Sequence, residues 1–283
     1  MSAARPPEGA QRRSPEGEGS MAGAARPPEG TQRRSPEGEG SVLGAARPPV
    51  QSRDWSSGGQ GLRYDAATLS QPDIALLQPQ TYRERATVVS SGGRNAAWYV
   101  EGDFGAAVLR QYRRGGMMAR VSKAHYFWTG AQRTRGFAEF ELLQYLYESG
   151  LAVPRPLAAA YWRTSWTYRA ALLTERLPSV RPLWECYSDI DHESVARAIF
   201  EMHEAGVWHA DLNATNILVD HNGKVWLIDF DKSHREDLSE ERRQANMLRL
   251  HRSLAKLAGP AGFQWWVDLN RCYIGLWRRK GGL

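Results

Sequence analysis

Three polar side chains near the C-terminal third of the chain have the types and spacing that phosphoryl transfer requires. Asp211 lies five residues before Asn216, and Asp229 follows that asparagine by thirteen residues. One carboxylate can orient an attacking hydroxyl group and accept its proton, while an amide oxygen and a second carboxylate can hold Mg²⁺ against phosphates. We therefore expect Asp211 to be the catalytic base and Asn216 and Asp229 to be Mg²⁺ ligands, with ATP as the phosphoryl donor.

The residues around this set predict a short hairpin. Ile217–Val219 and Val225–Ile228 are apolar runs on either side of a turn at Asp220–Gly223. An isolated His-x-Asp would be an ordinary turn, but the full set of intervals resembles the catalytic and metal-binding loops of the protein kinase superfamily. His209 is then expected to pack behind the loop. Asp231 replaces the usual glycine after Asp-Phe, where it can contact the metal or cap the next segment.

Residues further upstream are candidates for binding the nucleotide phosphates. Gly92 and Gly93 lie between two strand-like runs, and glycines there let backbone N–H groups approach phosphate oxygens, although such a turn also makes ordinary hairpins. Arg110 lies at the end of a third strand-like run, where a kinase carries lysine, and it stays cationic. Lys123 is the nearest lysine downstream but falls outside that run, so Arg110 is the favoured phosphate-binding residue.

Two glutamates complete the predicted nucleotide site. Glu139 lies in an expected helix over Phe137–Ser149 and is the candidate partner of the phosphate-binding cation. Glu141 in the same helix is the alternative, and either could be a solvated charge. Glu175 follows the strand-like run Ala170–Thr174, which resembles the hinge whose backbone contacts adenine. The plain alternative there is a buried strand followed by a turn.

The chain divides by composition into a repetitive tail and a region able to form a core. Residues 3–20 and 24–41 are nearly identical copies with a 21-residue period, rich in Pro, Gly, Glu and Ser. Such a segment cannot offset the entropy cost of ordering, so residues 1–61 are predicted to be a disordered low-complexity tail. Beyond it we expect an α+β, bilobal protein-kinase-like fold with a small β-rich N-lobe (62–175) and a helical C-lobe (176–283). The remaining expected strands are Ala86–Ser90, Ala96–Glu101 and Ala106–Tyr112, and the remaining expected helices are Val195–Ala205, Leu238–Leu257 and Trp265–Trp277.

Bulk composition narrows the class of protein. Of 283 residues, 42% are hydrophobic and 24% charged, which is typical of a soluble globular protein. No apolar run is long enough to span a membrane, the N-terminus lacks the apolar segment of a secretory signal, and two cysteines make no disulfide framework. A cytoplasmic location is therefore predicted. The net charge of +6 can favour nucleic acid, an anionic membrane surface or phosphorylated ligands, or it can simply reflect a GC-rich genome.

Four stretches together resemble a more specific family. They are Leu109–Gly116, Thr134–Phe140, Asp211–Leu218 and Trp226–Lys232. In combination they resemble the bacterial 3-deoxy-D-manno-octulosonic acid (Kdo) kinases, which belong with the lipopolysaccharide kinases of the kinase superfamily, and the resemblance spans roughly residues 62–277. One departure is Thr215, where this family is expected to have histidine, and it puts a loop contact in doubt.

The resemblance implies a substrate and a location. It implies phosphoryl transfer from ATP, with Mg²⁺, to the 4-hydroxyl group of a Kdo residue on Kdo–lipid A during lipopolysaccharide core assembly. The enzyme would act as a peripheral protein at the cytoplasmic face of the bacterial inner membrane, with no nucleic-acid partner. The side chains that could meet the acceptor or the membrane are Arg113, Arg114, Arg120, Arg133, Arg135, Tyr126, Phe127 and Trp128. The plain alternative is that these arginines are solvated and these aromatic rings belong to the core.

Two alternatives stay open at this point. The first keeps the fold and changes the acceptor to a heptose, an aminoglycoside or a protein serine, although no Ala-Pro-Glu run typical of protein kinases follows Asp231. The second is a non-catalytic nucleotide-binding scaffold, suggested by arginine at the lysine position. The intact set of Asp211, Asn216 and Asp229 argues against a scaffold.

Overall fold

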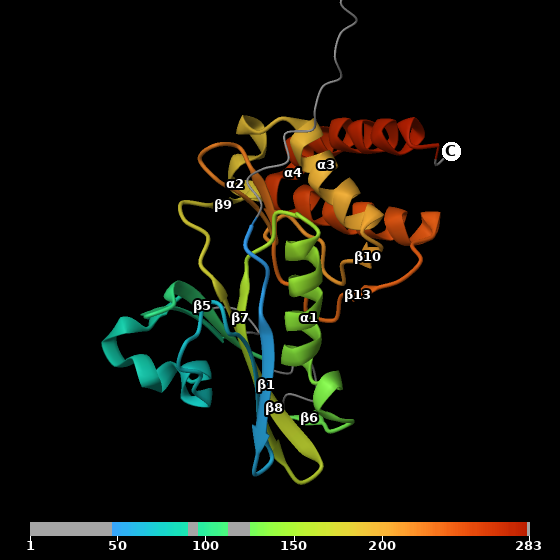
Figure 1. Cartoon of the computed structure of the whole chain (residues 1–283). Helices are drawn as coiled ribbons and strands as arrows, with labels where there is room; N and C mark the ends of the chain where they lie inside the picture. The colour runs from blue at the N-terminus through green and yellow to red at the C-terminus, as the bar shows by residue number, and fades with distance from the viewer. Residues whose placement is uncertain (1–46, 90–95, 113–124, 282–283) are drawn as a thin grey trace, which may run out of the picture. The chain divides into compact units, whose positions relative to one another are not determined.

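The computed structural model describes residues 47–89, 96–112 and 125–281 (Figure 1). All of them belong to one unit spanning Ala45–Leu283. The repeats at 3–20 and 24–41, with Gly92 and Gly93 and the alternative cation Lys123, lie outside the described residues. The unit contains a β-rich lobe followed by a helical lobe, so the predicted α+β bilobal architecture is confirmed (Figure 1).

The N-lobe is built on one antiparallel sheet with the strand order β1-β2-β7-β8-β5-β4-β3, in which β6 also pairs with β8. The strands expected around the glycine turn and after it are present as β3, β4 and β5, while β1, β2, β6 and β7 had no sequence assignment. The bounds are β1 (Ser52–Ser57), β2 (Gln60–Asp65), β3 (Thr87–Val88), β4 (Ala96–Gly102), β5 (Gly105–Gln111), β6 (Tyr126–Phe127), β7 (Pro156–Thr164) and β8 (Thr167–Glu175).

Both faces of the sheet are apolar. Alternate side chains of a strand point to opposite faces, and the central strands carry apolar residues at both sets of positions. In β7, Ala158 and Ala160 belong to one buried cluster, while Ala159 and Tyr161 belong to the other. Helix α1 (Arg135–Glu148) covers the second face, and two 3₁₀ segments cover the first. These segments and the two remaining 3₁₀ turns are η1 (Ile74–Leu77), η2 (Pro79–Arg85), η4 (Ala131–Arg133) and η5 (Tyr187–Asp189).

Gly136 lets the start of α1 approach the sheet closely. A Cβ atom at this position would lie 2.9 Å from the carbonyl oxygen of Ala171 in β8. Since backbone cannot easily move aside, a larger residue would push α1 away from the sheet. The close approach matters for function because α1 carries Arg135 and Glu139, which face the interlobe cleft.

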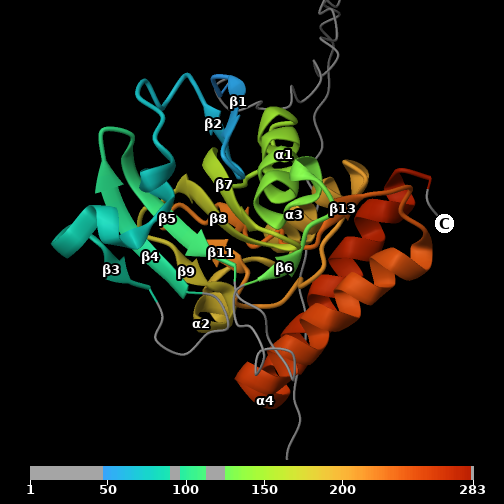
Figure 2. The ribbon, with the colours of Figure 1, turned by 90° about the horizontal axis from the view of Figure 1, so that it is seen from below.

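The C-lobe is mainly helical and confirms the expected helices. Two small sheets, β12-β11-β9 and β10-β13, complete it. Helices α3 and α4 lie together, away from the β3–β4 edge of the large sheet (Figures 1 and 2). The bounds are β9 (Arg181–Pro182), α2 (Leu183–Cys186), α3 (His192–Glu204), β10 (Val207–Trp208), β11 (Ile217–Val219), β12 (Val225–Leu227), β13 (His234–Arg235) and α4 (Glu240–Arg279).

The two helices expected at the C-terminus follow each other directly within α4 and are separated by a kink at Gly259. Gly259 in α4 has φ 60° and ψ −146°, which is not helical, and Pro260 follows it. Proline also lacks the N–H that a helix interior needs, so the two residues together bend the element. No helix in the described part of the chain is long and apolar enough to cross a membrane.

The predicted boundary between tail and folded region at residues 61 and 62 was placed too late. Strand β1 begins at Ser52 and pairs along its length with β2. All six residues of β1 are exposed, and most of them are polar. The strand therefore carries no apolar pattern of its own, and its partner strand β2 holds it at the sheet edge. The side chain of Asp65 also ties this region down, because it accepts a hydrogen bond from the backbone of Gln51 at 2.9 Å.

Candidate active site

A cleft of about 910 Å³ lies between the two lobes, and it contains most of the residues predicted from the sequence. The apolar part of its lining is suited to a nucleotide base, since ligand pockets combine apolar walls with a few placed polar groups. Its apolar lining includes Val89, Ala97, Val108, Leu172, Leu177, Leu218 and Ile228, and its charged and polar lining includes Arg110, Glu139, Glu175, Asp211, Asn216, Asp229, Asp231, Lys232 and Arg249.

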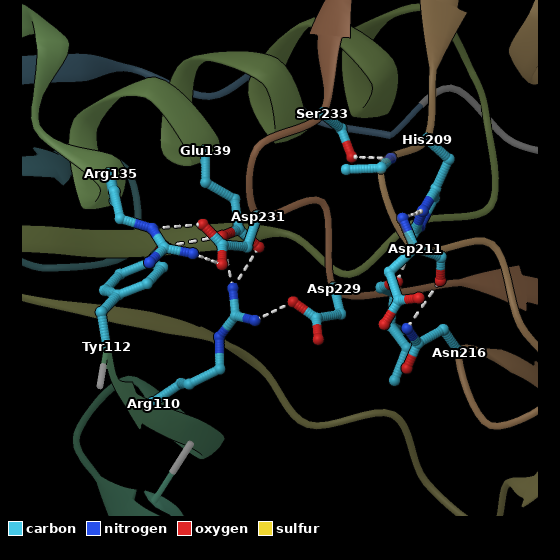
Figure 3. A network of polar contacts seen from close by, with 12 residues as sticks. Arg110, Tyr112, Arg135, Glu139, His209, Asp211, Asn216, Asp229, Asp231 and Ser233 are labelled. Carbon is cyan, nitrogen blue, oxygen red and sulfur yellow. Dashed lines mark hydrogen bonds and ion pairs between the residues drawn. The ribbon is translucent and has the colours of Figure 1, made fainter. Parts of the chain in front are cut away.

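The loop after β10 brings Asp211 and Asn216 together (Figure 3). The side-chain Nδ2 of Asn216 donates to the backbone carbonyl of Asp211 at 2.9 Å. This bond uses the amide nitrogen, so the amide oxygen is the group that can bind a metal ion. Asn216 is buried, whereas the Asp211 side chain is 54% exposed, as expected for a base that must reach an external hydroxyl group.

His209 supports the loop from behind, as predicted. Its Nε2 lies 3.1 Å from the carbonyl oxygen of Ile228, and its Nδ1 accepts from the backbone N–H of Asp211 at 3.1 Å. A carbonyl can only accept and an N–H can only donate, so the ring is neutral with its proton on Nε2. Burial lowers the pKa of His209, which also favours the neutral ring.

A second buried layer holds His209 in turn. The side chain of Asn246 in α4 donates to the carbonyl of His209 at 2.7 Å and accepts from its N–H at 3.2 Å. His203 in α3 contacts the same Asn246 oxygen through Nε2 at 3.1 Å, and its Nδ1 lies 2.6 Å from the hydroxyl of Tyr273. Burial lowers the pKa of His203 to about 4, so this ring is neutral as well. The catalytic loop is thus fixed to two C-lobe helices by neutral, fully buried groups.

Arg110 is held by two carboxylates (Figure 3). Its guanidinium pairs with Glu139 of α1 and with Asp229, and the hydroxyl of Tyr112 donates to Glu139 at 2.7 Å. Burial lowers the pKa of Arg110, but the two carboxylates outweigh it and hold the pKa well above its usual range. For Glu139 burial is the larger effect and raises the pKa in spite of the arginine. The expected pairing of Arg110 with Glu139 is therefore present in the structure.

Asp231 binds an arginine, which is neither of the two roles considered for it from the sequence. The Arg135 side chain approaches both carboxylate oxygens, with Nε at 2.6 Å from Oδ1 (Figure 3). The same guanidinium donates to the Tyr126 hydroxyl at 2.6 Å and lies over the Tyr112 ring. Arg135, one of the residues expected to meet the acceptor, also lines the cleft, and its contact with the acceptor stays a prediction.

Helix α1 therefore contacts both Arg110 of the N-lobe and the loop that contains Asp229 and Asp231. Arg135 and Glu139 are four residues apart in α1, so they lie on the same face of the helix. Glu139 holds the phosphate-binding candidate Arg110, and Arg135 holds Asp231, two residues beyond Asp229. The direct pair of Arg110 with Asp229 closes the ring. Asp229 has φ 62°, a left-handed conformation that is uncommon for a residue with a side chain, and these contacts hold the loop that contains it.

The donor set suits Mg²⁺ better than a metal that needs many protein ligands. Asn216 and Asp229 both line the cleft with oxygen atoms. No group of three or more His, Cys, Asp or Glu residues able to hold a metal ion occurs among residues 47–89, 96–112 and 125–281. Mg²⁺ commonly takes one or two protein oxygens and completes its shell with phosphates and water. The residues present therefore fit Mg²⁺ bound together with a nucleotide.

The side of the cleft next to Asp211 is more open. Arg249 of α4 lies 3.2 Å from the Asp211 carboxylate, and its own side chain is 42% exposed. Water screens such a pair strongly, so the contact orients Asp211 without fixing it. Nothing in the helical sequence pattern of residues 240–257 marks Arg249 as facing the loop that holds Asp211.

Comparison with known proteins identifies the family. The model of the lipopolysaccharide kinase (Kdo/WaaP) family matches residues 80–273. The chain belongs to this family. It is 50% identical over 206 residues to the 3-deoxy-D-manno-octulosonic acid kinase of Xanthomonas campestris pv. campestris (strain B100), covering 69% of this chain and 80% of that relative.

Two further members of the Kdo/WaaP family extend the match. The 3-deoxy-D-manno-octulosonic acid kinase of Xanthomonas axonopodis pv. citri (strain 306) is 49% identical over 219 residues, covering 76% of this chain and 87% of the relative. That of Xylella fastidiosa (strain M23) is 44% identical over 224 residues, covering 76% and 90%. The solved bifunctional kinase-methyltransferase WbdD aligns with 64% of this chain and 42% of its own at 18% identity and a TM-score of 0.37, too low to support an argument.

Because the chain belongs to this family, the protein is a kinase. The structure also shows where the predicted glutamates lie. Glu139, and not Glu141, pairs with Arg110; Glu141 is 73% exposed and lies 3.6 Å from Arg63 instead. Glu175 ends β8 and lines the cleft, and its N–H donates to the carbonyl of Arg155 at 2.9 Å. Its N–H is therefore already bonded, and the adenine contact expected next to Glu175 stays a prediction. The phosphate contacts predicted for Gly92 and Gly93 remain predictions.

Proposed function

We propose that this protein transfers the γ-phosphoryl group of ATP to the 4-hydroxyl group of a Kdo residue on Kdo–lipid A, in lipopolysaccharide core biosynthesis. The observation that carries the proposal is the meeting of Asp211, Asn216 and Asp229 in one cleft with the Arg110–Glu139 pair. The Kdo acceptor is supported by relatives of 44% to 50% identity that are named as Kdo kinases. Phosphoryl transfer by positioning and electrostatics needs this set of groups and little else.

Each residue of the cleft has a separate role in the proposed reaction. Asp211 orients the acceptor hydroxyl and takes its proton as the oxygen forms a bond to the γ-phosphorus and the bond from that phosphorus to the bridging oxygen of ADP breaks. Asn216 and Asp229 would hold Mg²⁺, which would supply positive charge to the phosphate oxygens. Arg110 adds a second cation, and Glu139 and Tyr112 fix its direction.

The test is direct phosphorylation of the acceptor. The purified full-length chain is incubated with ATP, Mg²⁺ and Kdo–lipid IV A, and the product is analysed by mass spectrometry and fragmentation to locate the phosphate. We expect one phosphate on the Kdo 4-position, and none on lipid IV A without Kdo. Heptose-containing and aminoglycoside acceptors are run in parallel. A folded enzyme that binds ATP and phosphorylates only one of these other acceptors would contradict the proposal.

We also propose that the protein works as a peripheral protein at the cytoplasmic face of the inner membrane. The proposal is supported by the acceptor, whose lipid A part is anchored in a bilayer. The basic net charge of +6 is consistent with attraction to anionic lipids. Cell fractionation should place the protein in the membrane pellet and high salt should release it; extraction by detergent alone would contradict peripheral attachment.

A further inference from the structure

Three segments meet at the end of the sheet farthest from the C-lobe, and we call this region the hairpin end. It consists of Trp55–Arg63, Tyr126–Gly130 and Trp162–Arg169. The tips of β1–β2 and β7–β8 lie side by side there (Figure 1), since the backbone of Arg163 donates to the carbonyl of Gly59 at 2.8 Å. Phe127 of β6 pairs with Thr167 on the other side. Residues distant in sequence thus form one surface.

The hairpin end exposes aromatic side chains. Trp166 is 82% exposed, Phe127 66% and Trp55 47%. These are three of the most exposed large apolar side chains in the described part of the chain, and they come from three different segments of one surface. Scattered single apolar residues need no explanation, but a gathering of large aromatics at one end is typical of an interaction site.

Trp166 stands on a rigid support. Thr164 pairs with Thr167, so Ser165 and Trp166 alone form the turn between β7 and β8. Ser165 has φ 54°, a left-handed conformation that tight two-residue hairpin turns require. Both strands are interior to the sheet, with β2 beside β7 and β5 and β6 beside β8. Trp166 is therefore held out from the molecule by the sheet itself, and its docking would cost little backbone entropy.

The charged side chains within the three segments are all arginines, and Asp54, which precedes Trp55, is paired with one of them, Arg63. Within the described residues of the three segments the ionisable acids and bases other than tyrosine are Arg63, Arg163 and Arg169, and there is no carboxylate. Arg163 lies over the Trp128 ring at 4.9 Å and Arg169 over the Trp162 ring at 5.8 Å. The nearby carboxylate of Asp54 is already neutralised by Arg63 at 2.8 Å. The occupant should therefore be both apolar and anionic.

We propose that the hairpin end docks on an anionic lipid bilayer, with Trp166 inserted at the level of the headgroups and Arg163 and Arg169 against lipid phosphates. Tryptophan is enriched at membrane interfaces because its ring is apolar and its N–H is polar. Arginines stacked on aromatic rings keep their charge in the headgroup layer while covering apolar surface. The proposal rests on the membrane location proposed above and adds the surface responsible for it.

The test is flotation of the full-length protein with vesicles of two compositions. One is an equal mixture of phosphatidylethanolamine and phosphatidylglycerol, and the other is phosphatidylcholine alone. We expect binding to the first and little to the second. Trp166→Ser should weaken binding by roughly tenfold, because a large buried apolar group is lost. Arg163→Gln and Arg169→Gln should each weaken it by about fivefold and reduce its sensitivity to salt.

Phe263→Ala provides the matched control, since Phe263 is an exposed aromatic at 46% that lies in α4 of the C-lobe. It should bind vesicles like the wild type. Equal binding by wild type and Trp166→Ser, or loss of binding in Phe263→Ala alone, would overturn the proposal. So would a wild-type dimer in gel filtration that Trp166→Ser dissociates, since a second copy would then be the occupant.

A second readout separates this proposal from the proposed function. Trp166→Ser should keep wild-type turnover on a water-soluble Kdo oligosaccharide and lose turnover on Kdo–lipid IV A in vesicles. If the Kdo activity itself is absent, vesicle binding still tests the surface. If the variant loses turnover on both acceptors while its melting temperature is unchanged, Trp166 acts in the acceptor site and the docking proposal is wrong.

Discussion

The nucleotide side and the acceptor side of the cleft hold their charges very differently. On the nucleotide side, the Glu139 side chain is 2% exposed and that of Arg110 is 12% exposed, and both belong to a closed ring of contacts with Asp229. On the acceptor side, Asp211 and Arg249 are 54% and 42% exposed and meet through one contact of 3.2 Å. Water and salt weaken the second pair far more than the first.

The difference suggests where the enzyme fixes geometry in advance. The phosphates and Mg²⁺ need the same arrangement in every turnover, and a buried ring of ion pairs keeps that arrangement before the substrate binds. The proposed acceptor is a large glycolipid, and an open, weakly held base can follow the position of its hydroxyl group. Removing groups from the two sides should therefore have different effects. On the open side turnover should fall while the free energy of unfolding stays the same, and on the buried side the free energy of unfolding should fall.

The largest expected effect is on turnover, from the open side. Asp211→Asn keeps the shape and removes the proton acceptor, so kcat should fall by roughly 10²–10⁴. The free energy of unfolding should hardly change because Asp211 is half exposed. Turnover with ATP and the Kdo acceptor, together with urea unfolding, measures both. Asp268→Asn, an exposed carboxylate of α4 paired with Arg271, is the control and should keep wild-type turnover.

The next effect concerns stability on the buried side. Glu139→Ala leaves the buried Arg110 with Asp229 as its remaining carboxylate partner and should destabilise the fold by about 3 kcal/mol, since breaking a buried pair leaves an uncompensated charge. Glu141→Ala in the same helix removes a side chain that is 73% exposed, and should cost less than about 1 kcal/mol. Urea unfolding of both variants measures the contrast, and equal losses would show that burial does not distinguish the two glutamates.

The meeting of the candidate catalytic residues in one cleft was predictable from sequence, because their spacing is short and fixed by a hairpin. Asp211, Asn216 and Asp229 all come from one stretch around β11 and β12, and the structure places them in one cleft. The pairing of Arg110 with Glu139 was also predicted, from a strand followed by a helix. Both cases rest on local periodicity and on a resemblance to known families.

What escaped prediction depends on contacts between distant segments. The partner of Asp231 is Arg135, and that of Asp211 is Arg249; these pairs are 96 and 38 residues apart. No local pattern encodes them, because an arginine on a helix surface looks the same whether it faces solvent or a loop. Strand β1 escaped for a similar reason: its side chains are all exposed and mostly polar, and only pairing with β2 makes it a strand.

A third prediction concerns the link between α1 and the metal-binding loop. If Arg135 acts by holding Asp231, then Arg135→Met and Asp231→Asn should each slow turnover, and the double variant should be no slower than the worse single one. The coupling energy from this cycle should be about 1–3 kcal/mol. Additive effects on kcat would mean that Arg135 and Asp231 act separately, with Arg135 free to serve the acceptor.

A fourth prediction uses the neutral layer behind the catalytic loop. The folded pKa of His203, about 4, lies below its ordinary value of 6.5, so the unfolded chain takes up the proton first as pH falls. Stability is therefore complete above about pH 6.5 and declines toward pH 4, with a loss of about 2 kcal/mol between pH 7 and pH 5. Urea unfolding at both pH values measures it. His203→Gln should reduce the loss by the part that His203 contributes, and a slope from His209, whose pKa burial also lowers, should remain. His234→Gln, at an exposed site, should keep the full slope.

The smallest expected effect is at Arg249, and it is the sharpest test of the comparison. Because its contact with Asp211 is open to water, Arg249→Gln should lower kcat/KM for the acceptor by no more than about fivefold and leave the KM for ATP unchanged. Raising the salt concentration should shrink the difference between variant and wild type. Activity should be measured at low and high salt with each substrate varied in turn. A loss as large as that of Asp211→Asn, or a rise in the KM for ATP, would mean that the open side is held as firmly as the buried one.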